Sequence, residues 1–120
     1  MSDASEALTP DEARILSAIA RCSPIAEALL AQVNSARVAA RRWTGVGLYV
    51  DFTVPEVAVA LPHAEPICYG VTGMMAGRFC WFTLWLTDDR SRLQFLEVAT
   101  AGPDDLPAGS SVESLEGEPV

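Results

Sequence analysis

The stretch RFCWFTLWL, residues 78–86, constrains the fold more than any other part of the sequence. Successive side chains of a β-strand point to opposite faces of the sheet, and large apolar residues occur here at both parities. One row is expected in the core and consists of Cys80, Phe82, Leu84 and Leu86. The other row consists of Phe79, Trp81, Thr83 and Trp85. A sheet with this strand must therefore have both faces covered, or it exposes aromatic side chains.

Two helices are expected before the first strand. Thr9 is a typical N-cap, Pro10 suits the first helical position, and Glu12 completes a capping box. A second helix is predicted over residues 23–34, with Ser23 as its cap and Pro24 in its first turn. Both helices are short, so their stability must come from packing against another element.

After Asn34 the apolar spacing changes from about 3.6 residues to 2, which indicates strands. Five strands are expected, at residues 36–43, 48–54, 67–75, 79–86 and 92–100. The proline-bounded segment 55–66 is expected to be a loop, and TDDRS, residues 87–91, a turn. We therefore predict an α+β fold in which two N-terminal helices pack on one face of a five-stranded antiparallel sheet.

Length and charge suggest the domain organisation and exclude some partners. A single α+β domain is expected over residues 9–103, between a disordered N-terminus (1–8) and an acidic flexible tail (104–120).

The net charge is −8, yet residues 9–103 hold nine carboxylates against eight arginines. No basic patch is present, so nucleic acid is not an expected partner. No apolar run resembles a signal peptide or spans a bilayer, so no membrane association and a cytoplasmic location are expected.

Candidate catalytic and ligand-binding patterns are weak. His63 is the single histidine, and no nucleophile signature lies near it. The three cysteines lack metal-ligand spacing, so no metal is expected and the thiols are expected in the core. Gly45 and Gly47 precede a strand rather than a helix, which is atypical of a dinucleotide site. We expect no catalytic residue and no cofactor, so an enzymatic role is not favoured.

The segments TGVGLYVDFTVP and RLQFLEV together resemble a pattern found in small uncharacterised bacterial proteins. The resemblance covers residues 36–99 and implies an α+β fold without an assigned activity. A bacterial origin is also suggested by the absence of lysine and the abundance of alanine and arginine. The matching residues are Gly45, Gly47, Tyr49, Asp51, Phe52, Leu93, Leu96 and Glu97.

The exposed aromatic face carries the functional prediction. We expect a small non-enzymatic interaction protein, such as an immunity or antitoxin protein or an assembly subunit. A homodimer is favoured over a foreign protein partner, unless the sheet curls or the 55–66 loop covers the face. The alternative is a ligand-binding protein or enzyme with a site near that loop. The predicted interface residues are Tyr49, Phe79, Trp81 and Trp85, and the alternative pocket residues are Asp51, His63, Glu65 and Tyr69.

Overall fold

The computed structural model describes residues 6–55, 58–62, 67–102, 105–116 and 118. Helices α1 (Pro10–Arg21) and α2 (Ala26–Ser35) come first in the chain. Six strands follow: β1 (Arg37–Trp43), β2 (Gly47–Thr53), β3 (Cys68–Met75), β4 (Arg78–Leu86), β5 (Leu93–Thr100) and β6 (Val112–Leu115). They form one antiparallel sheet in the order β1-β2-β5-β4-β3-β6. The α+β class and the N-terminal helices are confirmed, whereas the prediction of five strands is wrong.

The start of α1 has the predicted capping box. The Thr9 hydroxyl accepts a hydrogen bond from the Glu12 backbone at 3.1 Å, and the Glu12 carboxylate accepts one from the Thr9 backbone at 2.8 Å. In contrast, α2 begins at Ala26, after Ile25, and has no side-chain cap. Ser23 instead extends the end of α1, because its backbone and its hydroxyl both donate to the Ala20 carbonyl.

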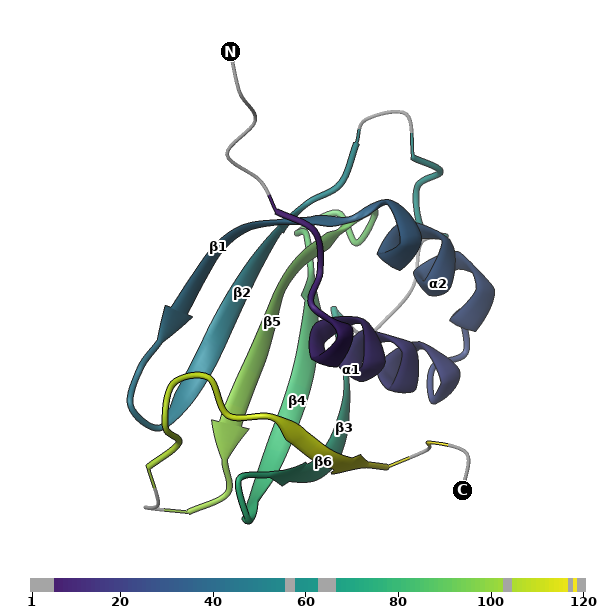
Figure 1. Ribbon diagram of the computed structural model, residues 1–120. Coiled ribbons are helices and arrows are strands. Elements are labelled where there is room, and N and C mark those ends of the chain that lie inside the picture. The colour runs from purple at the N-terminus through teal and green to yellow at the C-terminus, as the bar shows by residue number, and fades with distance from the viewer. Residues whose placement is uncertain (1–5, 56–57, 63–66, 103–104, 117, 119–120) are drawn as a thin grey trace.

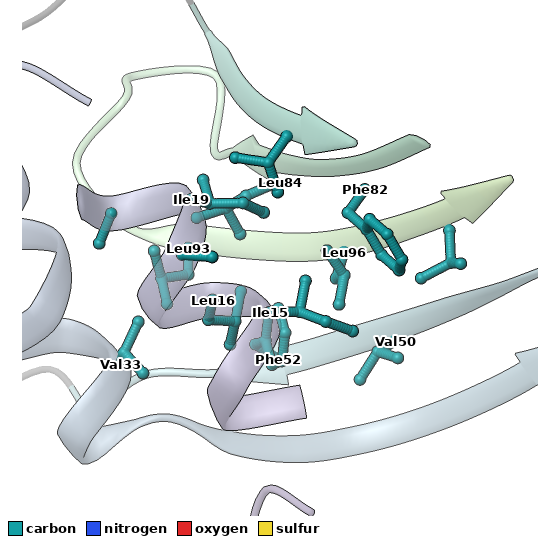
Figure 2. Close-up of a cluster of buried hydrophobic side chains, with 14 of the residues drawn as sticks. Ile15, Leu16, Ile19, Val33, Val50, Phe52, Phe82, Leu84, Leu93 and Leu96 are labelled. Atoms are coloured by element: carbon teal, nitrogen blue, oxygen red, sulfur yellow. The ribbon is translucent and has the colours of Figure 1, made fainter. Parts of the chain in front are cut away.

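Both helices lie on one face of the sheet (Figure 1). The core fills the space between this face and the apolar stripe of α1, where Ile15, Leu16 and Ile19 are buried (Figure 2). The predicted core row of β4 is buried almost completely, with exposed fractions of 0–1%. Two-residue alternation therefore places one row of β4 beneath the helices and the other row on the opposite face.

The sixth strand comes from the segment that the sequence analysis assigns to a flexible tail. β6 pairs with β3, and Gly73 permits this because a Cβ there would collide with the Ser114 carbonyl oxygen. Leu106, Val112 and Leu115 are buried in the core. The tail prediction is therefore wrong for residues 105–116, because a four-residue strand among polar residues is too short to produce a recognisable period.

Arg14 joins the C-terminal segment to α1. Its guanidinium binds the Glu118 carboxylate with N···O distances of 2.7 and 2.8 Å. It also donates to the carbonyl oxygens of Val112 and Glu113, both at 3.1 Å. Acidic residues that suggest a solvated tail in the sequence therefore help to hold the tail on the helix.

The predicted disordered N-terminus also requires correction at its inner end. The backbone of Glu6 forms two hydrogen bonds with Val38, at 2.7 and 2.8 Å, and Leu8 packs against the core. Residues 6–8 therefore extend the fold beside β1. The remainder of that prediction, residues 1–5, lies outside the described residues.

Leu106 gives a direct test of the C-terminal segment. Leu106→Ala should lower the free energy of unfolding by about 3 kcal/mol, because it leaves a cavity at a side chain that is 1% exposed. Val59→Ala is the matched control: Val59 is 82% exposed, so the change should stay within about 0.5 kcal/mol. Urea unfolding followed by circular dichroism measures both. Equal free energies of unfolding for the two variants would show that Leu106 is not packed in the core and belongs to a flexible tail.

Candidate functional site

The sheet face turned away from the helices carries five aromatic side chains, which we call the aromatic outer face. Cross-strand pairs define it, because residues directly opposite each other in an antiparallel pair point to the same side. One row runs from Asp51 through Phe95 to Trp85, and the next from Tyr49 to Glu97. Phe79 and Trp81 are 49% and 55% exposed. The members of the aromatic outer face are Tyr49, Phe79, Trp81, Trp85 and Phe95.

Glu97 lies at the centre of the aromatic outer face and orders its rings. The Tyr49 hydroxyl donates to one carboxylate oxygen of Glu97 at 3.2 Å, and the Trp85 indole N–H donates to the other at 3.1 Å. The Phe95 ring stacks on Trp85 with centroids 5.9 Å apart, and its centroid is 6.1 Å from that of Tyr49. These contacts therefore hold the rings of the β2–β5–β4 part of this surface in place.

Arg42 adds a positive charge to the same face. Its guanidinium carbon lies 5.0 Å from the centroid of the Tyr49 ring, which is a cation–π contact. Arg42 is directly opposite Tyr49 in the β1–β2 pair. Glu97 and Asp51 supply negative charges nearby, so this face carries both signs.

A β-bulge in β1 sends Arg41 to the core side of the sheet. The register shifts between Val38 and Ala40, and Arg41 then pairs with the buried Val50. Its guanidinium binds the Glu12 carboxylate through two hydrogen bonds, at 2.6 and 2.8 Å, and the Glu6 carboxylate at 2.6 Å. The bulge therefore links the edge strand to the start of α1.

The Glu12 carboxylate is almost completely buried, and two opposing effects set its pKa. Burial raises the pKa, but hydrogen bonds from Arg41 and the Thr9 backbone, with the charge of Arg41, outweigh it. The net result is a pKa below the usual value of 4.5. Glu12 is therefore ionised in the folded protein at neutral pH and forms a charged pair with Arg41.

The depressed pKa makes this ion pair sensitive to pH. Glu12→Gln should cost about 2 kcal/mol at neutral pH, since Arg41 keeps Glu6 as a partner. Glu12 has the lower pKa in the folded state, so its stabilisation is present above about pH 4.5 and decreases as the pH falls through the folded-state value. Urea unfolding at about pH 7 and about pH 3 should show the difference between wild type and variant shrinking at low pH. A constant difference would show that Glu12 stabilises the fold through packing alone.

The structure describes two of the four residues predicted for a pocket near the 55–66 loop, Tyr69 and Asp51. Tyr69 pairs with the buried Leu84 and lies on the core side, where its hydroxyl is buried and has no hydrogen-bond partner among the described residues. Asp51 pairs with Phe95 on the aromatic outer face and is exposed. His63 and Glu65 lie outside the described residues. Tyr69 and Asp51 point to opposite sides of the sheet, so they cannot line one pocket.

A cavity of about 460 Å³ lies elsewhere, at the N-terminal end of α1. No contiguous sequence pattern predicts this cavity, because its walls come from residues far apart in the chain. In the sequence, only Arg41 and Trp43 hint at this cavity, because they are large side chains at the end of a strand rich in arginine. The lining residues are Thr9, Pro10, Asp11, Glu12, Ile15, Arg41, Trp43, Leu48, Met75, Leu96, Val98, Gly109, Ser110 and Ser111.

The pair Asp88–Asp89 lies in the turn between β4 and β5. One oxygen of Asp89 accepts hydrogen bonds from the Ser91 backbone at 3.0 Å, the Ser91 hydroxyl at 2.6 Å and the Thr87 hydroxyl at 2.7 Å. These bonds, those from Ser91 first, lower the pKa of Asp89 to about 2. The turn predicted from TDDRS is confirmed. One carboxylate oxygen of Asp89 accepts three hydrogen bonds within it.

The three cysteines lie in different environments. Cys80 is in the core, where burial raises the pKa of its thiol. Cys68 is partly exposed opposite Trp85, and Cys22 is exposed, so the expectation that all three thiols lie in the core is wrong. Within the described ranges, no group of three or more histidine, cysteine or acidic side chains could hold a metal ion.

Thiol labelling should follow this order of exposure. In native protein Cys22 should react first and Cys68 more slowly. Cys80 should react only when the protein unfolds, because its thiol is buried and its pKa is raised. Mass spectrometry of peptides after timed labelling measures all three sites in one sample. Early modification of Cys80 would mean that the β3–β4 hairpin opens readily.

Comparison of the chain with family models, curated proteins and solved structures found no match. No helix in the described part of the chain is long and apolar enough to cross a membrane. The resemblance to small bacterial proteins stays a prediction.

Proposed function

We propose that this chain is a non-enzymatic interaction protein that forms a two-fold homodimer through the aromatic outer face. One observation carries the proposal: Phe79 and Trp81 are about half exposed on a sheet face that the helices do not cover. Exposed apolar surface of this kind marks an interface in soluble proteins. Tryptophan and tyrosine are also among the residues enriched where partners pack.

The charges of this face support a second copy as the occupant. In a two-fold dimer the same patch meets itself, so it must be complementary to itself. Arg42 on β1 and the carboxylates of Asp51 and Glu97 give the patch both signs. A copy rotated by the two-fold axis can therefore set a cation of one chain against a carboxylate of the other.

The two edges of the sheet favour contact through the face over strand-to-strand contact. The β1 edge is partly occupied, because the backbone of Glu6 is bound to Val38. The β6 edge is only four residues long, and Glu116 follows it directly. Short, partly covered and charged edges discourage pairing with another chain.

This proposal fits a small bacterial cytoplasmic protein that acts by binding another protein through its surface. An immunity protein, an antitoxin or a subunit of a larger assembly would use a preorganised aromatic face in this way. A foreign protein on the same face is the alternative occupant.

Trp81→Glu tests the proposed interface, because Trp81 is the most exposed member of the aromatic outer face. The variant should be a folded monomer, since water solvates the new carboxylate while a partner surface rejects it. Its melting temperature should remain within a few degrees of the melting temperature of Val59→Glu, an exposed control in the 55–66 loop. Light scattering coupled to size-exclusion chromatography should find wild type and Val59→Glu as dimers.

Two outcomes would contradict this proposal. Wild type could be monomeric at high micromolar concentration, which would leave a foreign protein as the occupant of the aromatic outer face. Alternatively, Trp81→Glu could remain dimeric, which would place the dimer contact on another surface.

A further inference from the structure

The cavity at the N-terminal end of α1 exists because the sheet is wider than its helical cover. Figure 1 shows β1 and β2 reaching beyond the helices near their shared hairpin. There the segment that leads into β6 crosses the core side and takes the place of a third helix. This segment, residues 105–111, forms one wall through Gly109, Ser110 and Ser111.

Hydrogen bonds donated by two backbone amides hold this wall at both ends. The Leu106 backbone donates to the Gly45 carbonyl at 2.8 Å, which ties the segment to the β1–β2 hairpin. The Val112 backbone donates to the Asp11 carboxylate at 3.1 Å, which ties its other end to α1. Leu106 also anchors the segment in the core, where it is buried. The segment therefore crosses the opening of the cavity and is fixed at both ends.

Apolar side chains from several elements form the floor of the cavity. They belong to α1 and to strands β2, β3 and β5, and Trp43 at the end of β1 forms a partly exposed side wall. A volume of about 460 Å³ lies within the range of small-molecule sites, about 300–1,000 Å³. The floor residues are Ile15, Leu48, Met75, Leu96 and Val98.

The charged groups of the lining restrict the charge of a ligand. Among the described lining residues Arg41 is the only cation, and it already binds the carboxylates of Glu12 and Glu6 and donates to the Ala7 carbonyl at 3.3 Å. Asp11 and Glu12 place two carboxylates at the same mouth. An anion would meet two like charges and a guanidinium that is already bound, so the lining disfavours anions.

We infer that this cavity is a binding site for a small, uncharged, ring-containing molecule. The ring lies on the floor of Leu48 and Val98 and against Trp43, where apolar burial and ring contact stabilise it. The hydroxyls of Thr9 and Ser111 at the mouth are the polar groups that orient a hydroxyl, carbonyl or ring N–H of the ligand. This site lies on the core side of the sheet, so it is independent of the proposed dimer face.

Indole and indole-3-acetate are matched probes, because they share one ring system and differ in charge. Titration into full-length protein is followed by two-dimensional ¹H–¹⁵N NMR spectra. Indole should cause saturable shifts of the Leu48, Ser110 and Ser111 amides, and indole-3-acetate should bind at least about tenfold more weakly. Shifts confined to Trp81 and Trp85 would mean that the ring binds the aromatic outer face, and would overturn the inference.

Two substitutions complete the test. Trp43→Ala removes the side wall and should weaken indole binding at least about tenfold, which corresponds to about 1.4 kcal/mol. Trp81→Ala, on the opposite face of the sheet, should leave indole binding unchanged. Three results would each overturn the inference: no saturable shift at millimolar indole, equal binding of both probes, or equal affinity of Trp43→Ala and wild type.

Discussion

The packing of α1 against one face of the sheet is the interaction on which the rest of the structure depends. Ile15, Leu16 and Ile19 bury the stripe of the helix against the core rows of the strands (Figure 2). A short helix has little stability alone, and a sheet with one apolar face cannot leave that face in water. Each element therefore supplies the cover that the other needs. Because both helices are used on one face, the opposite face is left to solvent or to a partner.

The β-bulge in β1 connects this packing to the edge of the sheet. Without the shift between Val38 and Ala40, Arg41 would point to the aromatic outer face and Arg42 to the core side. The shift turns Arg41 toward Glu12 at the start of α1, where the ion pair restrains the N-terminal end of the helix. The same pair forms part of the cavity wall. The β-bulge therefore contributes both to the stability of the start of α1 and to the charged lining of the proposed ligand site.

The two proposed sites use opposite sides of one sheet and different physical chemistry. The aromatic outer face is broad, carries charges of both signs and is ordered by the hydrogen bonds that Tyr49 and Trp85 donate to Glu97. It suits a large partner that excludes water over several rings. The cavity is concave, mostly apolar and bordered by an ion pair that is already satisfied. It suits one small molecule, so dimerisation and ligand binding can be measured separately.

The sequence by itself determined the features that depend on neighbouring residues. The capping box of Thr9 and Glu12, the alternation in residues 79–86 and the turn at TDDRS each depend on residues a few positions apart. Tyr49, Phe79, Trp81 and Trp85 could therefore be assigned to one face before the fold was known. Only the tertiary structure decided the pairing of β6, the bulge that redirects Arg41 and the cavity. These features depend on contacts between distant segments, such as Gly73 with Ser114, and no local spacing encodes such contacts.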